Sequence, residues 1–210
     1  MLRWPSARWA LVVVSALILG PVGVALVRRW TPPPPPRTPI DVLDTPSGIV
    51  DEATRTLNRR GITSSLIEAM AQSQRYSTPL SLVVVALDAR DPLPALADPL
   101  ARVAAVLSES VRLPDRLGRY QDQEFLVVLP QTRLEEALKV GERLRTTIAT
   151  VTAQAAGDGR GLTISVGTAA FGRGQDLERF LANAHTALTA AQAAGGNRVS
   201  RFQPDRATDA

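Results

Sequence analysis

Three charged residues that could bind an anionic or hydrogen-bonding ligand stand in two segments of the sequence. Arg112 and Asp115 lie in VRLPD, and Arg143 lies further along in VGERLR. An arginine offers a planar fork of donors that fits a phosphate or a carboxylate, and it can stack on a planar ring. An aspartate accepts hydrogen bonds from N–H and O–H donors. The alternative is structural: Arg112 would pair with Asp115, and Arg143 would belong to a solvated helix face beside Glu142.

The elements that must position these side chains are predicted from hydrophobic periodicity and from turn residues. Some segments have apolar residues at helical spacing, and others have the continuous or alternating apolar runs typical of strands. The expected elements are a helix over 62–75, a strand over 80–87, a helix over 100–111, a hairpin of 115–120 with 124–129, a long helix from about 134, a strand over 161–171, a helix over 176–194 and a short strand over 198–202. The long helix is expected to begin at an N-cap, Thr132, with Glu135 three residues on. Helices that alternate with strands around one hairpin predict an α/β fold with a mixed sheet flanked by helices.

The composition excludes several classes of protein. Without cysteine the chain forms no disulfide and no thiolate metal site, and its only histidine, His185, cannot build a zinc site alone. We expect His185 to be structural or solvent-facing on its Ala- and Leu-rich helix. Five of the 24 basic residues but none of the 20 acidic residues precede residue 40, which leaves 19 basic against 20 acidic residues in the remainder. A nearly neutral globular part argues against nucleic-acid binding.

The N-terminal segment, residues 1–30, has the features of a membrane anchor. Residues 9–27 are uncharged and mostly apolar, and a helix of that length spans roughly 28 Å, close to the hydrocarbon thickness of a bilayer. All three tryptophans, Trp4, Trp9 and Trp30, lie at or just outside its ends, where indole rings settle at the lipid–water interface. The alternative is a cleaved signal peptide, but no small-residue cleavage site precedes Arg28 and Arg29. We therefore expect an uncleaved transmembrane helix.

The rest of the chain divides into a linker, a domain and a tail. Residues 31–50 are predicted to be a proline-rich linker, in which the unbroken prolines 32–36 form an extended polyproline II spacer. Residues 51–203 are predicted to form the globular domain, and residues 204–210 a disordered tail.

Six segments of the globular part occur in the order of a known family. They are DEATRTLNRRGI, PLSLVVVALD, RLGRYQDQEFLVVLP, LEEALKVGERLR, LTISVGTA and GGNRV. Together they resemble the GGDEF domain of diguanylate cyclases over residues 51–202. The resemblance implies a nucleotidyl-cyclase-like (ferredoxin-like) sheet. It also implies a dimeric enzyme in which each subunit holds one GTP and two metal ions assist the formation of cyclic di-GMP.

The signature of the family is altered in this sequence. Where the family has RYGGDEF, residues 119–125 read RYQDQEF. Gln121 and Asp122 replace two glycines that let the backbone approach the nucleotide, and Gln123 replaces a carboxylate that holds metal in the family. Glu124 and Phe125 are retained. A neutral amide is a poor substitute for an anion facing Mg²⁺.

The other residues that contact GTP and metal in the family are also missing. The second metal carboxylate falls on Ala86, with Asp88 two residues further on. The Lys and Arg that resemble phosphate clamps fall on Gln192 and Gly196, and the guanine-contacting segment after the first strand is shortened to ARDPLPALADPLARV. We therefore expect no catalysis, no metal and no cofactor. Mg²⁺ would be required only if the chain were an active cyclase that uses Asp88 and Glu124.

One ligand site of the family is retained. Arg112 and Asp115 match the inhibitory RxxD motif, and Arg143 matches the arginine on the next helix that helps to bind cyclic di-GMP. We expect a catalytically inactive GGDEF protein that acts as a cyclic di-GMP receptor or interaction module. Two alternatives stay open: an active diguanylate cyclase, and a structural partner of another GGDEF protein, as homodimer or heterodimer. The family's use of cytosolic nucleotides implies a cytoplasmic domain on a single-pass anchor in the bacterial inner (cytoplasmic) membrane.

Overall fold

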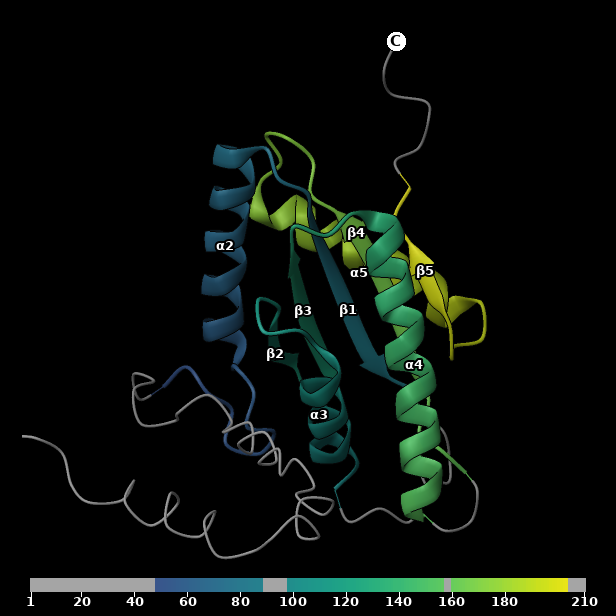
Figure 1. Cartoon of the computed structure of the whole chain (residues 1–210). Helices are drawn as coiled ribbons and strands as arrows, with labels where there is room; N and C mark the ends of the chain where they lie inside the picture. Colours follow the sequence, from purple (N-terminus) through teal and green to yellow (C-terminus); the bar gives the residue numbers. More distant parts are fainter. Residues whose placement is uncertain (1–47, 89–97, 157–159, 204–210) are drawn as a thin grey trace, which may run out of the picture. The chain divides into compact units, whose positions relative to one another are not determined.

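The computed structural model describes residues 48–88, 98–156 and 160–203. These residues form, in chain order, α2 (Arg59–Tyr76), β1 (Leu80–Leu87), α3 (Pro99–Ser110), β2 (Arg116–Gln121), β3 (Glu124–Pro130), α4 (Leu134–Ala156), β4 (Ile164–Ala170), α5 (Leu177–Ala193) and β5 (Val199–Arg201) (Figure 1). The order and type of these elements are those predicted from the sequence. The expected strand over 161–171 is shorter than predicted, because regular pairing begins only at Ile164.

Several expectations lie outside the described residues. They are the membrane helix over 9–27, the proline-rich spacer over 32–36, most of the shortened segment after β1 and the tail over 204–210. Within the three described ranges, no helix has the combination of length and hydropathy needed to cross a bilayer.

The sheet has the strand order β2-β3-β1-β4-β5. Every neighbouring pair is antiparallel except β4 and β5, which run parallel. The sheet is therefore mixed, as predicted. The central strand β1 is buried over nearly its whole length, which explains its continuous run of apolar residues.

Helices cover both faces of the sheet, and alternate side chains of β1 point to each face. Val83 and Val85 pack in one buried cluster with residues of α3 and α4. Leu82 and Val84 pack in the other with residues of α2 and α5. Figure 1 shows α3 and α4 in front of the sheet and α5 behind it. The domain is thus a three-layer α/β sandwich.

Polar side chains begin the helices. Asn58, Asp98 and Asp176 each accept a backbone N–H at the start of α2, α3 and α5, as N-caps do. The N-cap predicted for α4, Thr132 with Glu135 three residues on, was wrong by one residue. Glu136, not Glu135, accepts from the N–H of Arg133 at 3.2 Å, while the Thr132 hydroxyl donates to the Pro130 carbonyl at 2.9 Å.

The segment before α2 closes the free edge of β2. Leu57 donates its N–H to the Leu117 carbonyl at 3.2 Å and accepts the N–H of Arg119 at 2.7 Å. The guanidinium of Arg119 also forms an ion pair with Asp51, 3.3 Å from Nη1 to Oδ2. Backbone pairing of this kind satisfies part of an edge strand that would otherwise expose its donors and acceptors.

Candidate functional site

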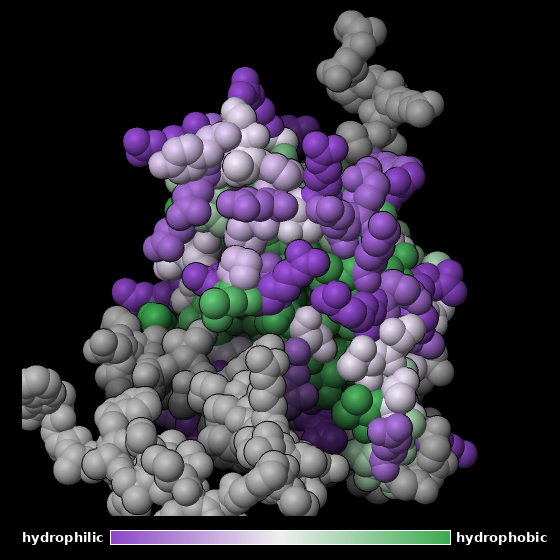
Figure 2. Space-filling model, in the orientation of Figure 1, coloured by the Kyte–Doolittle hydropathy of each residue, from purple (hydrophilic) through white to green (hydrophobic). Residues whose placement is uncertain are grey.

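A pocket of about 280 Å³ gathers the three residues singled out from the sequence as a ligand site. It is lined by side chains from the turn between α3 and β2, from the end of β3 and the connection that follows it, and from the first half of α4, and these include Arg112, Asp115 and Arg143. Lys139 and Glu136 of α4 line it as well. On the molecular face that Figure 2 displays, hydrophilic residues cover the outer surface of α2 and the upper part of α4, and hydrophobic residues show between them.

The connection between α3 and β2 positions the first two residues. The helix α3 stops at Ser110, and Val111 is already extended, with φ −87° and ψ 155°. The chain then turns tightly, because Asp115 donates its N–H to the Arg112 carbonyl at 3.1 Å. The Asp115 carboxylate accepts the N–H of Arg112 at 2.9 Å. This turn holds Arg112 and Asp115 at the mouth of the pocket and faces them towards α4.

The structural roles considered for Arg112, Asp115 and Arg143 as an alternative to ligand binding are observed only in part. Asp115 binds the backbone of Arg112, and in the described part of the chain no ion pair joins its carboxylate to a guanidinium. Arg143 donates from Nη2 to the Ser110 carbonyl at 3.1 Å, which ties α4 to the end of α3. Glu142 is engaged by Arg145 and not by Arg143. The guanidinium of Arg112 and most donors of Arg143 therefore face the pocket without a carboxylate partner.

The electrostatics of the pocket are set by Asp115. Burial raises the pKa of its carboxyl group above the ordinary value, although the Arg112 N–H and the charges of Arg112, Arg143 and Arg116 oppose this shift. A half-buried carboxylate that lacks enough donors is in a position to accept hydrogen bonds from a ligand.

The altered signature lies at the other end of β3, and its residues Tyr120 and Glu124 lie on the opposite face of the sheet from the pocket. Ala86 of β1 pairs directly with Glu124 of β3 and with Ser165 of β4. The carboxylate of Glu124 contacts His185 of α5, with 3.2 Å between Oε2 and Nε2. The ring of His185 lies 5.9 Å from the ring of Tyr120, between centroids. The side chains that surround Ala86 are thus bound to one another.

His185 has a structural role, as expected. Its Nδ1 lies 2.9 Å from the Leu181 carbonyl of its own helix, and its side chain is half-buried. The hydrogen bond to Glu124 raises the pKa of His185, and burial opposes the shift. The imidazole, placed between a carboxylate and a carbonyl, joins α5 to β3.

Asp88 is held by the C-terminal loop. Its Oδ1 accepts from the Ser165 hydroxyl at 2.6 Å, and its Oδ2 accepts from the Asn197 N–H at 2.9 Å. Gly196 approaches so closely that a Cβ atom there would lie 3.0 Å from Oδ1. One carboxylate oxygen of Asp88 thus binds β4, and the other binds the loop that precedes β5.

The three substituted signature residues, Gln121, Asp122 and Gln123, are exposed in the hairpin turn. They take part in the fold through their backbone. The Asp122 carbonyl accepts from Arg119 Nη2 at 2.9 Å, and the Gln123 carbonyl accepts from the Leu87 N–H at 3.1 Å. Gln192, expected at a phosphate-contacting position, is exposed at the end of α5.

The residues at the family's metal positions do not fit Mg²⁺, which requires several oxygen ligands in near-octahedral geometry. Ala86 has no side-chain oxygen, Glu124 is bound to His185, and Asp88 has both oxygens engaged. Among the residues that the structure describes, no group of three or more His, Cys, Asp or Glu side chains could hold a metal ion. We derive no catalytic step through a metal at this place.

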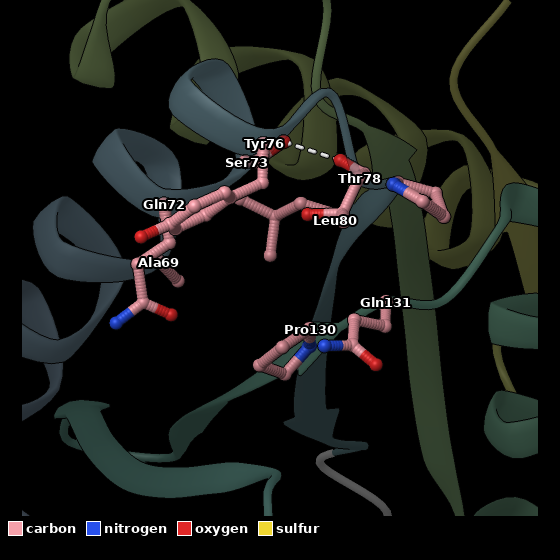
Figure 3. A pocket seen from close by; sticks show the side chains of 9 residues that line it. Ala69, Gln72, Ser73, Tyr76, Thr78, Leu80, Pro130 and Gln131 are labelled. Carbon is pink, nitrogen blue, oxygen red and sulfur yellow. Dashed lines mark hydrogen bonds between the residues drawn. The ribbon is translucent and has the colours of Figure 1, made fainter.

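A second, smaller pocket of about 100 Å³ lies at the end of α2 (Figure 3). Tyr76, Pro79 and Pro130 are among the residues around it, and Ser73 donates to the Thr78 carbonyl beside it at 2.6 Å. No charged side chain lines it, so it lacks the donors and charges that would hold a nucleotide.

Two charged residues of the pocket were missed from the sequence. Lys139 lies four residues before Arg143 in the predicted helix LEEALKVGERLR, and this spacing places both on one face of α4. Glu136 lies one turn earlier. The helical spacing places both on the face of α4 that carries Arg143, whereas the neighbours of His185 depend on the strand register and carried no local signal.

The sequence of this chain is similar to that of known proteins. Residues 97–198 match the family model described as diguanylate cyclase, GGDEF domain. The chain is 31% identical over 161 residues to diguanylate cyclase DosC of Escherichia coli (strain K12). The matched region covers 73% of this chain and 35% of DosC. The chain thus spans about a third of the length of that relative.

Two solved structures have a similar fold. The GGDEF domain of DgcB from Caulobacter crescentus, in complex with c-di-GMP (cyclic di-GMP), matches with a TM-score of 0.68 at 21% identity, over 76% of this chain and 96% of that one. Diguanylate cyclase SiaD of Pseudomonas aeruginosa, in complex with its activator SiaC, matches with a TM-score of 0.65 at 28% identity. This match covers 73% of the present chain and 62% of the SiaD chain.

Proposed function

Residues 97–198 are a GGDEF domain, and we propose that this domain is a catalytically inactive receptor for cyclic di-GMP in the signalling that uses this nucleotide. The single observation that carries the proposal is that Arg112, Asp115 and Arg143 line one pocket. They do so while the positions that would bind metal and GTP hold other residues.

The chemistry of the pocket suits a guanine nucleotide. Arg112 and Arg143 supply forked donors for guanine O6 and N7 or for phosphate, and Asp115 supplies an acceptor for the guanine N–H edge. The volume of about 280 Å³ is at the lower edge of the range for ligand pockets, roughly 300–1,000 Å³. We therefore expect part of the ligand to enter the pocket while the remainder lies on the surface.

The proposal of inactivity rests on Ala86, Gln123 and Asp88. Phosphoryl transfer to a ribose hydroxyl depends on electrostatic stabilisation of the triphosphate, and two missing metal carboxylates remove most of it. The carboxylate of Asp88 could replace them only by releasing Ser165 and Asn197.

Calorimetric titration of the full chain in detergent with cyclic di-GMP tests the receptor function. We expect binding at micromolar concentration that is lost in Arg112→Ala. Arg179→Ala is the matched control, because Arg179 is exposed on α5 and does not line the pocket. No binding by the wild-type chain at tens of micromolar would remove the receptor function and favour a protein-interaction module.

The proposal of inactivity has a separate test. Incubation of the full chain with GTP and Mg²⁺ or Mn²⁺ is expected to yield no cyclic di-GMP. Product that forms in the wild-type chain and disappears in Glu124→Ala would establish an active cyclase instead.

The interaction module would pair with a second copy or with another GGDEF protein. Co-purification of an active cyclase that persists in Arg112→Ala would favour this function over ligand binding. The membrane anchor is proposed from residues 9–27 alone. Its test is membrane fractionation, in which the chain should resist an alkaline wash and lose this resistance when residues 1–30 are deleted.

A further inference from the structure

The pocket contains one positive charge that the family resemblance does not assign. Lys139 is the only lysine in the chain, and the other 23 of the 24 basic residues are arginines. This single lysine lines the pocket together with Arg112, Asp115 and Arg143.

The position of Lys139 on α4 is fixed by the same helix that carries Arg143. Four residues of α-helix rise about 6 Å, so the two cations project from one helix face on successive turns. Lys139 is exposed, and so is Arg143. The pocket therefore offers a second cation one turn away from the first.

The nearby carboxylates of Glu136 and Glu142 contact groups other than the Lys139 ammonium. Glu136 accepts the N–H of Arg133 at the start of α4, and Glu142 is paired with Arg145. Within the described ranges, Lys139 forms no ion pair with any carboxylate. Its side chain is exposed and forms no ion pair in the described ranges, so its ammonium group is in a position to contact a ligand.

We propose that Lys139 is a further ligand-contacting residue of this pocket and that its ammonium group binds a phosphate of the nucleotide. This inference rests on the proposed function of the pocket. Lysine is a compact charge with three rotatable donors, which suits a phosphate, whereas the forks of Arg112 and Arg143 also suit a base edge. A ligand with more than one phosphate can use both turns of α4.

The single lysine makes the contact directly observable. Reductive methylation of the full chain with ¹³C-formaldehyde keeps the positive charge and labels only Lys139 and the N-terminal amine. Lys139→Arg identifies the lysine signal by its disappearance. We expect cyclic di-GMP to shift the Lys139 signal with the same midpoint as the calorimetric titration.

Affinity gives the second measurement. Lys139→Gln should weaken cyclic di-GMP binding about tenfold, the size of one charge-assisted hydrogen bond, and should reduce the dependence of the affinity on salt. Lys139→Arg should stay within about twofold. Arg133→Gln is the matched control, because it removes one positive charge from the same end of α4 but does not line the pocket.

The outcomes separate the two proposals. If the wild-type chain binds but the Lys139 signal does not move and Lys139→Gln keeps full affinity, the contact is absent and the receptor function stands. If Lys139→Gln and Arg133→Gln weaken binding equally, the effect is long-range attraction and the contact is again rejected. If the wild-type chain does not bind at all, both proposals fail.

Discussion

Ala86 lies directly opposite Glu124 in the antiparallel pair of β1 and β3, on the sheet face covered by α2 and α5. Facing residues in such a pair have Cβ atoms about 5 Å apart. A carboxylate at position 86 would therefore stand beside the carboxylate of Glu124, in a place where Ala86 is only 3% exposed. An alanine here lets Glu124 bind His185 without a competing negative charge.

The first prediction is that Ala86→Asp destabilises the fold. Burial of a second carboxylate beside Glu124 should cost about 1–3 kcal/mol at neutral pH without divalent cations. Millimolar Mg²⁺ should recover part of the loss by bridging the two carboxylates. Thermal unfolding with and without Mg²⁺ measures both effects. Ala86→Asn, which has the same shape without the charge, should not respond to Mg²⁺; an equal response in both variants would refute the explanation.

The sequence predicted the elements around this pair well but not its contacts. The apolar run of β1 and the hairpin around the signature are local patterns, so their order and type followed from periodicity. The hydrogen bonds of Asp88 join residues 77 and 109 positions apart in the chain. Which side chains meet at the end of a strand depends on register and on neighbouring loops, and no local pattern records either.

The residues of the ligand pocket were likewise predicted only in part from the sequence. Arg112 and Asp115 were recognisable because a short motif fixes their spacing, and Arg143 because it follows at a family position. Lys139 and Glu136 required the helix α4 to be placed against the turn after α3. The retention of the motif could be read from the sequence, whereas the charge balance of the pocket needed the structure.

A second prediction separates a ligand role for Asp115 from a structural one. Burial raises the pKa of Asp115 in the folded state, so folding favours the protonated carboxyl group. The stabilisation from this protonated group is complete below the unfolded-state pKa and is lost as the pH rises through the folded-state pKa. At pH 7 the ionised carboxylate thus lowers stability. Asp115→Asn, which still accepts the Arg112 N–H, should raise the melting temperature by roughly 1–3 °C while binding cyclic di-GMP at least about tenfold more weakly. A lower melting temperature together with unchanged affinity for cyclic di-GMP would assign Asp115 to the fold alone.

A third prediction concerns His185 and pH. Its folded-state pKa is raised, chiefly by the hydrogen bond with Glu124, so the stabilisation is complete below the unfolded pKa of about 6.5 and is lost as the pH rises through the higher folded value. Tyr120 of β2 also faces the imidazole, and Arg59 of α2 lies over the Tyr120 ring at 4.9 Å. The wild-type chain should therefore lose roughly 2–4 °C of melting temperature relative to His185→Gln between pH 6 and 8. Glu124→Gln should remove the same pH dependence, and parallel curves for wild type and His185→Gln would contradict the assignment.

The last prediction tests how α2 and the segment before it are seated on β2. Gly118 lies where both approach the strand: a Cβ atom there would stand 2.5 Å from Ile62 Cβ and 2.9 Å from the Leu57 carbonyl oxygen. Because neither backbone can yield without breaking the pairing of Leu57 with β2, Gly118→Ala should lower the free energy of unfolding by about 2–4 kcal/mol. Denaturant unfolding measures this loss. Gly172→Ala is the control, because its Cβ would meet only the end of the Gln175 side chain at 3.5 Å, and it should stay within about 0.5 kcal/mol of wild type. Equal stability of the two variants would mean that the contact between α2 and β2 is looser than the structure has it.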